Sequence, residues 1–186
     1  GTANLAMNLM DEGTKDKTSL EINEQLQLLG ASLSTFSSQD ESNVYMSTLK
    51  PSLDASLDLF MDVVLNPVFP QKEFERLQKE QLNNIKQEKS QPITMALRVM
   101  NKYLYGEDHP YSSPYTGTGY EDSVSNLTRD DVVDFYNTWF KPNNSTLIVT
   151  GDVEMSELKS KLEKTLGKWK KGDVPTIAFN EPKTGS

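Results

Sequence analysis

The chain opens with GTANLAMNLMDEGT, residues 1–14, in which apolar side chains recur at helical spacing. Gly13 follows the last of them and is a natural end for a helix. We therefore predict an amphipathic helix over residues 2–12. Asn4 and Asn8 share one face of this helix, because side chains at i and i+4 are neighbours on a helix surface.

The next stretch changes from helical to strand periodicity. Thr18 or Ser19 can cap a second helix, which Gly30 ends. Apolar and polar residues then alternate over 31–36 and again over 44–49, on either side of a polar connection. This alternation predicts two antiparallel strands.

Several helices and one further strand follow. The apolar run at 147–149 predicts a well-buried strand over 145–150. Helices are predicted from Pro51 to Asn66, over 71–88, from Pro92 to Gly106, from Thr128 to Phe140 and over 156–166. Strict βαβ alternation is absent. The order therefore favours an α+β fold, with helices packed on one face of a mainly antiparallel sheet.

Length and composition indicate one globular domain. The chain has 186 residues, of which 35% are hydrophobic and 25% charged, enough to bury a real core. We expect residues 1–170 to form a single α+β domain. Residues 171–186 have the composition of a linker toward a further domain. Because the sequence starts inside a predicted helix and without Met, we also expect it to be part of something longer.

Charge and residue usage exclude several classes of function. The formal net charge is −8, which argues against binding the phosphate backbone of nucleic acids. No apolar stretch approaches the roughly 20 residues that span a bilayer, so we expect no membrane span. The chain has no Cys and a single His, His109, so neither a thiolate site nor a two-His zinc site can be assembled from it.

Three groups of residues resemble the insulinase/pitrilysin family of zinc metallopeptidases. Residues 1–14 are similar to the family's helix with the inverted zinc motif H-x-x-E-H, which ends in Gly-Thr. Residues 26–33 are similar to the helix-to-strand passage that follows. The remaining matches are Leu65-Asn66-Pro67-Val68-Phe69-Pro70 with the helix after it, His109-Pro110-Tyr111, Gly117, Thr128-Arg129-Asp130-Asp131 and Trp139 to Val153.

The resemblance implies a fold like that of insulinase and mitochondrial processing peptidase, without the first N-terminal strands of that domain. It also implies where the metal site of active members would lie. The two His positions fall on Asn4 and Asn8, the general base falls on Met7, and the third ligand, a Glu on the long helix, falls on Asn84. All four positions are substituted, so we expect neither catalysis nor a bound metal.

The chemistry of these side chains supports the same expectation. Neutral amides are poor zinc ligands compared with imidazole, carboxylate or thiolate, and a Met thioether cannot act as a base. Without the resemblance, Asn4, Met7 and Asn8 would be an ordinary helix face. His109 precedes Pro110 in a turn, where a lone His is most often structural, and we assign it no catalysis.

The resemblance implies a role beside an active enzyme. Active members work as two homologous halves that close around a peptide, and one half carries zinc. This chain would be part of the other half, with a zinc-bearing half and a peptide substrate as partners and no cofactor of its own. The zinc-bearing half would be in the same parent chain or a separate subunit. Bacterial members of the family favour a location in the periplasm or cell envelope.

Two alternatives stay open. The chain could be a structural or interaction module of a larger complex, with no role in proteolysis. Measurable peptide affinity would favour the peptidase half, and an apolar docking face with a closed cleft would favour the module. An enzyme of unrelated mechanism has little support, since no nucleophile and base pair and no cofactor loop stands out.

Overall fold

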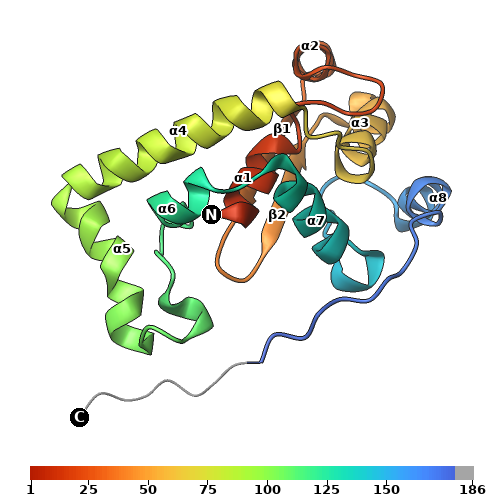
Figure 1. Ribbon diagram of the computed structural model, residues 1–186. Coiled ribbons are helices and arrows are strands. Elements are labelled where there is room, and N and C mark those ends of the chain that lie inside the picture. Colours follow the sequence, from red (N-terminus) through yellow and green to blue (C-terminus); the bar gives the residue numbers. More distant parts are fainter. Residues whose placement is uncertain (179–186) are drawn as a thin grey trace.

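The computed structural model describes residues 1–178, which form helices around one β-hairpin (Figure 1). The elements are α1 (Thr2–Leu9), α2 (Ser19–Leu29), β1 (Ser32–Ser37), β2 (Ser42–Ser47), η1 (Lys50–Ser52), α3 (Leu53–Leu65), α4 (Gln71–Ser90), α5 (Pro92–Tyr105), η2 (Pro110–Ser112), α6 (Glu121–Ser125), α7 (Arg129–Trp139), η3 (Pro142–Asn144) and α8 (Met155–Leu166). The α+β class predicted from the sequence is confirmed.

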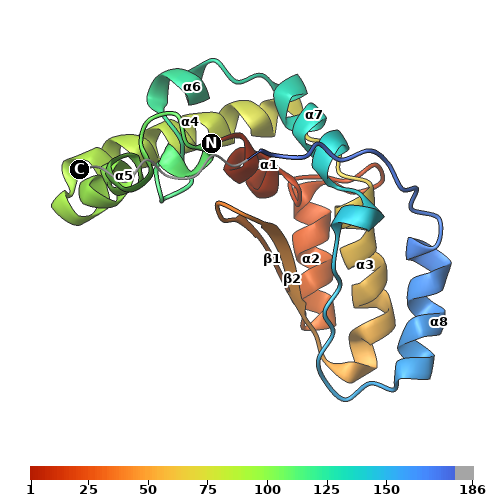
Figure 2. The ribbon, with the colours of Figure 1, turned by 90° about the horizontal axis from the view of Figure 1, so that it is seen from below.

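The hairpin forms one layer, and two helices packed on one of its faces form a second layer. β1 and β2 pair antiparallel, with Leu33 opposite Met46 and Thr35 opposite Val44. α2 and α3 lie side by side on one face of the hairpin, and α8 packs on the outer side of α3 (Figure 2). The buried side chains between these layers are Met7, Met10, Ile22, Leu26, Leu59 and Val63, with Leu33 and Val44 of the hairpin packed against them.

α1 is the central helix of the molecule. It contacts the hairpin, α4 and α7. A second cluster of buried side chains holds it to α4 and α7, and consists of Leu5, Ala6, Leu9, Phe69, Phe74, Leu77 and Val132. α1 therefore has apolar neighbours on most of its sides. Its polar residues lie on the side that these neighbours leave uncovered.

Local capping explains the ends of α2. Thr18 and Glu21 form a capping box, in which each side chain accepts a hydrogen bond from the backbone N–H of the other residue. Gly30 ends the helix in the left-handed region, at φ 60°, where a residue without Cβ is not strained. Both ends agree with the sequence prediction.

α1 is shorter than predicted. It ends at Leu9, and residues 10–12 form a turn. Gly13 and Thr14 are not a helix end but make isolated β-bridges to Thr18 and Pro67. Backbone pairing with segments distant in the sequence therefore replaces the last predicted helical turn.

The strand predicted over 145–150 is absent from the described structure. These residues have no regular secondary structure, and Ile148 is 80% exposed. A strand needs a neighbour to satisfy its backbone N–H and C=O groups, and no described segment pairs with this one. The short helix α6 was not predicted from the sequence.

α5 forms as predicted, but the side chains that it buries are polar. Its buried residues are Arg98 and Asn101, whereas Ile93, Tyr103 and Leu104 are exposed. Figure 1 shows α4 and α5 as an arm that extends from α1. No described helix is long and apolar enough to cross a membrane. Residues 171–178 have no regular structure, and the rest of the predicted linker, 179–186, lies outside the described residues.

Candidate functional site

Asn4 and Asn8 lie next to each other on α1. The Nδ2 of Asn8 donates a hydrogen bond of 3.3 Å to the Oδ1 of Asn4. Asn4 is half-buried and Asn8 is exposed. The i, i+4 spacing thus brings the two side chains together as expected, but as a pair of neutral amides that satisfy one another.

Met7 lies between Asn4 and Asn8 in the sequence, but its side chain points into the core. Its side chain is fully buried and packs in the cluster between α1, the hairpin, α2 and α3. A carboxylate at this position would lose its hydration, which is costly without a charged or hydrogen-bonding partner. The thioether instead fills apolar space, as Met does in irregular cores.

Asn84 is exposed on α4, the helix that runs beside α1. The Nε2 of Gln81 donates to the C=O of Gly1 at 3.1 Å, and Arg76 forms an ion pair with Glu12. These two contacts hold the two ends of the residue 1–12 segment against α4, and Asn84 lies one turn beyond Gln81. Asn84 makes no hydrogen bond to Asn4 or Asn8 within the described residues.

Metal-ligating side chains do not gather at this place. Among residues 1–178, no group of three or more His, Cys, Asp or Glu side chains is placed to hold an ion. His109 lies far along the chain, where its Nδ1 accepts a hydrogen bond of 3.1 Å from the N–H of Tyr111 and its ring stacks on Tyr105. It therefore caps η2, which agrees with a structural role.

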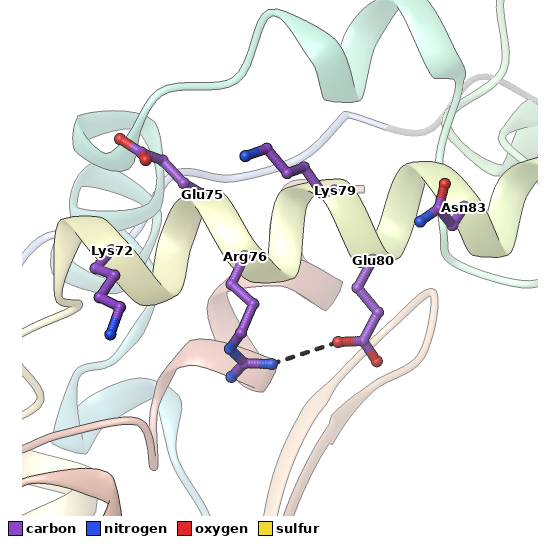
Figure 3. A pocket seen from close by; sticks show the side chains of 6 residues that line it. All are labelled: Lys72, Glu75, Arg76, Lys79, Glu80 and Asn83. Atoms are coloured by element: carbon purple, nitrogen blue, oxygen red, sulfur yellow. Dashed lines mark hydrogen bonds and ion pairs between the residues drawn. The ribbon is translucent and has the colours of Figure 1, made fainter.

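The outer face of α4 carries a shallow, charged surface (Figure 3), lined by Lys72, Glu75, Arg76, Lys79, Glu80 and Asn83. Arg76 and Glu80 turn toward each other, and Glu75 and Lys79 point the other way. The pKa of Arg76 is raised, first by its hydrogen bond to Glu73 and then by Glu12. These opposite charges neutralise one another along a solvated helix.

A buried polar network holds α5 to its neighbours, and sequence reasoning missed it. The guanidinium of Arg98 forms an ion pair with Glu88 and donates to the Oγ1 of Thr118 at 2.8 Å and to the C=O of Gly119 at 2.6 Å. The segment around Thr118 is thereby held against α4 and α5. No periodicity signals this network, because its partners come from three separate segments.

Two models of known protein families match this chain. Residues 1–119 match the model of the family described as Insulinase (Peptidase family M16), and residues 126–186 match that of the Peptidase M16 inactive domain. The chain belongs to the insulinase family, peptidase family M16. The family resemblance stated from the sequence is confirmed.

Curated relatives carry the names of peptidases. The zinc protease PqqE of Helicobacter pylori is 26% identical over 98% of this chain and 41% of its own length. The beta subunit of the mitochondrial-processing peptidase of Rattus norvegicus is 24% identical over 95% of this chain and 36% of its own length. The chain thus spans about 40% of the length of such relatives.

Solved structures share the fold. A peptidase M16 inactive domain from Pseudomonas fluorescens superimposes with a TM-score of 0.88 at 23% identity, over 98% of this chain and 44% of that one. The periplasmic protease PqqL of Escherichia coli gives a TM-score of 0.81 at 20% identity, over 97% of this chain and 21% of that one. Helices on an antiparallel hairpin are therefore part of the M16 fold.

Proposed function

We propose that this chain is a non-catalytic domain of a two-half M16 zinc peptidase, which pairs with a zinc-bearing half and helps to enclose a peptide. The observation that carries the proposal is the pair of hydrogen-bonded amides Asn4 and Asn8, with buried Met7 between them, where the resemblance expects two His ligands and a Glu base. Asn84 occupies the position at which the resemblance expects the third ligand, a Glu. Zinc would then be bound by the partner half alone.

The free edge of β1 supports the peptide-binding part of the proposal. β1 pairs with β2 along one edge, and no described strand covers the other. An extended peptide can add to such an edge through main-chain hydrogen bonds. One face of the hairpin packs in the core, whereas Phe36 and Tyr45 are exposed on the other face and offer apolar contacts.

The solved relatives support the two-half arrangement and the compartment. A structure exists of the first half of the periplasmic protease PqqL, and this chain covers 40% of it with a TM-score of 0.81. By analogy we place this protein in the periplasm or cell envelope. We also propose that residues 1–170 form one domain and that 171–186 link it to the next.

The first test is zinc content and peptidase activity, measured on this chain alone and then mixed with the zinc-bearing half from the same genome. We expect no zinc and no cleavage by the chain alone, and faster cleavage by the mixture than by the zinc-bearing half by itself. Stoichiometric zinc or cleavage by the isolated chain would overturn the proposal.

A second candidate is an interaction module without a role in proteolysis. The exposed apolar face of α5, formed by Ile93, Met100, Tyr103 and Leu104, favours it, because such patches mark surfaces that bind other proteins. The two candidates differ in peptide affinity. Binding of an unstructured peptide to the assembled halves supports the first, and stable assembly without any peptide binding supports the second.

A further inference from the structure

The sequence His109-Pro110-Tyr111 forms an aromatic turn after the carboxyl end of α5. The Nδ1 of His109 accepts a hydrogen bond of 3.1 Å from the backbone N–H of Tyr111 and so caps η2, which packs against α5. The rings of Tyr105, His109 and Tyr111 contact one another, with centroids 5.1 to 5.5 Å apart. The backbone and the ring of Tyr111 are therefore both held by His109.

Tyr111 in turn holds the turn of the β-hairpin, residues 38–41. Its phenol O–H donates a hydrogen bond to the carboxylate of Asp40. The other hydrogen bonds of the turn stay within it, since the Oγ of Ser38 accepts from the N–H groups of Asp40 and Glu41. Both views of the molecule show this end of the hairpin pointing toward the arm formed by α4 and α5 (Figures 1 and 2). Within residues 1–178, Tyr111 and Asp40 thus supply the hydrogen bond that joins the hairpin turn to the arm.

These contacts require a neutral imidazole at His109. A neutral imidazole has one N–H and one acceptor nitrogen, whereas the protonated ring donates from both nitrogens. Because Nδ1 accepts the N–H of Tyr111, a proton on Nδ1 would point at that N–H and break the cap of η2. Imidazole is also the side chain that ordinarily changes its charge between pH 5 and 8. A modest fall in pH can therefore act on this turn.

We propose that His109 is a pH-sensitive switch, which holds the hairpin turn to the arm while its ring is neutral and releases the turn when the ring is protonated. Loss of the cap frees η2 to rotate, so the phenol of Tyr111 leaves the carboxylate of Asp40. The hairpin and α4 both remain attached to α1. β1 ends at this turn, so release also loosens that end of the edge to which we assign the peptide, although the inference does not rest on that assignment.

The groups around His109 favour proton uptake but cannot replace the lost acceptor. Negative charges nearby and a stacked phenol ring both stabilise an imidazolium. The pKa of Tyr111 is raised, first by its hydrogen bond to Asp40, so its phenol stays protonated throughout the acid range. The titratable and charged groups on the elements next to His109 are Lys102 and Tyr105 of α5, Glu107 and Asp108 of the following loop, Tyr111 of η2 and Asp40 of the hairpin turn.

A distance measurement tests the switch. The chain has no Cys, so spin labels at Gln39→Cys, in the exposed hairpin turn, and at Ser113→Cys, just after η2, report their separation by double electron–electron resonance. We expect a short distance at pH 8 and a longer, broader one at pH 5.5. The ratio of short-distance to long-distance molecules should fall about tenfold, which corresponds to the loss of one hydrogen bond. The same distribution at both pH values would overturn the inference.

Variants of the labelled chain assign the effect to His109. His109→Asn keeps an acceptor for the N–H two residues on but does not titrate, so it should show the short distance at both pH values. If this variant opens in acid as far as the unmodified chain does, another group titrates and the inference is wrong.

Tyr111→Phe and Asp40→Ala each remove one partner of the link, and both should show the long distance at both pH values. Asp40 is exposed, so Asp40→Ala gives a result even if Tyr111→Phe disturbs η2, and circular dichroism checks that each variant is folded. A short distance in Asp40→Ala at pH 8 would show that another contact holds the hairpin turn, and would also overturn the inference.

Discussion

At the scale of single residues, the chemical types of the side chains limit metal binding and catalysis more firmly than their positions do. Asn4 and Asn8 offer neutral amide oxygens, which bind zinc poorly beside imidazole or carboxylate. Met7 is part of the core, so its replacement of a base is also a packing change. If the four positions correspond to the ligands and base of active members, restoring the ligands should restore metal binding.

The triple variant Asn4→His, Asn8→His, Asn84→Glu tests this correspondence. We expect it to bind one zinc ion and to gain about 2.7 kcal/mol of stability at a metal concentration 100 times the Kd. Met7 is left unchanged, since a buried Glu there would destabilise the core. Zinc content and Tm with and without zinc are the measurements.

The matched control moves the carboxylate by one residue, as Asn83→Glu with the same two His. Asn83 and Asn84 are both exposed on α4 but differ by about 100° around the helix axis, so only one of them can complete a site. Equal zinc binding by the two variants, or none by either, would contradict the assignment of Asn84.

Asp62 supports the turn that follows α1. Its carboxylate accepts hydrogen bonds from Thr14 at 2.8 Å, from Lys17 at 2.9 Å and from Asn66 at 3.0 Å. Burial raises the pKa of Asp62, but these three donors together outweigh it, and the net pKa lies below the ordinary value. The carboxylate therefore stabilises the fold above its unfolded-state pKa, and that contribution is lost as pH falls through the folded-state pKa.

Asp62→Asn should accordingly lower the free energy of unfolding by about 1–3 kcal/mol at pH 7, because it removes a charged acceptor. The difference from the unmodified protein should shrink below about pH 4. Urea unfolding across this range measures it. Asp58→Asn, one turn earlier on the exposed side of α3, is the control and should change stability by less than about 0.5 kcal/mol. A pH-independent difference would contradict the proposed cause.

At the scale of elements, the sequence predicts those whose determinants are local. The capping box of Thr18 and the left-handed Gly30 lie within a few residues of the helix they bound, so both ends of α2 follow from the sequence. The strand predicted at 145–150 is absent, because a strand forms only beside a partner strand that satisfies its backbone N–H and C=O groups. The burial of α5 also escapes prediction, because the partners of Arg98 come from other segments.

Arg98 should matter to α5 far more than the apolar residues around it. Arg98→Met leaves Glu88 and the C=O of Gly119 without their donor in a buried place, and should cost about 3–5 kcal/mol. Lys102→Met, one turn later on α5, removes an exposed ion pair with Glu107 and should leave the free energy of unfolding nearly unchanged. Chemical denaturation of both variants measures the difference.

A double variant separates the two causes of the Arg98 effect. Adding Glu88→Gln to Arg98→Met should recover part of the lost stability, because it removes the uncompensated charge. If the double variant loses as much stability as the two single variants added together, the two side chains are not coupled. The ion pair would then not hold α5 against α4.

At the scale of the whole molecule, composition alone excludes a thiolate site and a two-His site, whereas the geometry of the α1 face that carries Asn4 and Asn8 could not be predicted from it. One His and no Cys are properties of the sequence alone. Helix packing determines the hydrogen bond between Asn4 and Asn8, the inward orientation of Met7 and the position of α4 beside α1. The cavity between β2 and residues 147–153, likewise, arises only where two segments far apart in the sequence meet.

The net charge of the whole chain should shape the peptides that it helps to bind. With 27 acidic and 19 basic side chains, the formal charge of −8 produces a field that attracts cations over about 10 Å at 0.1 M salt. A Lys-rich peptide should therefore associate with the assembled halves about tenfold faster than a Glu-rich peptide of the same length and apolar pattern in 50 mM NaCl. The difference should largely vanish at 500 mM, where screening shortens the field, and a Gln-substituted peptide should fall between the two. Association rates by surface plasmon resonance measure this directly. Equal rates at low salt would mean that peptide entry is governed by the partner half, and failure of all three peptides to bind would contradict the role in peptide binding itself.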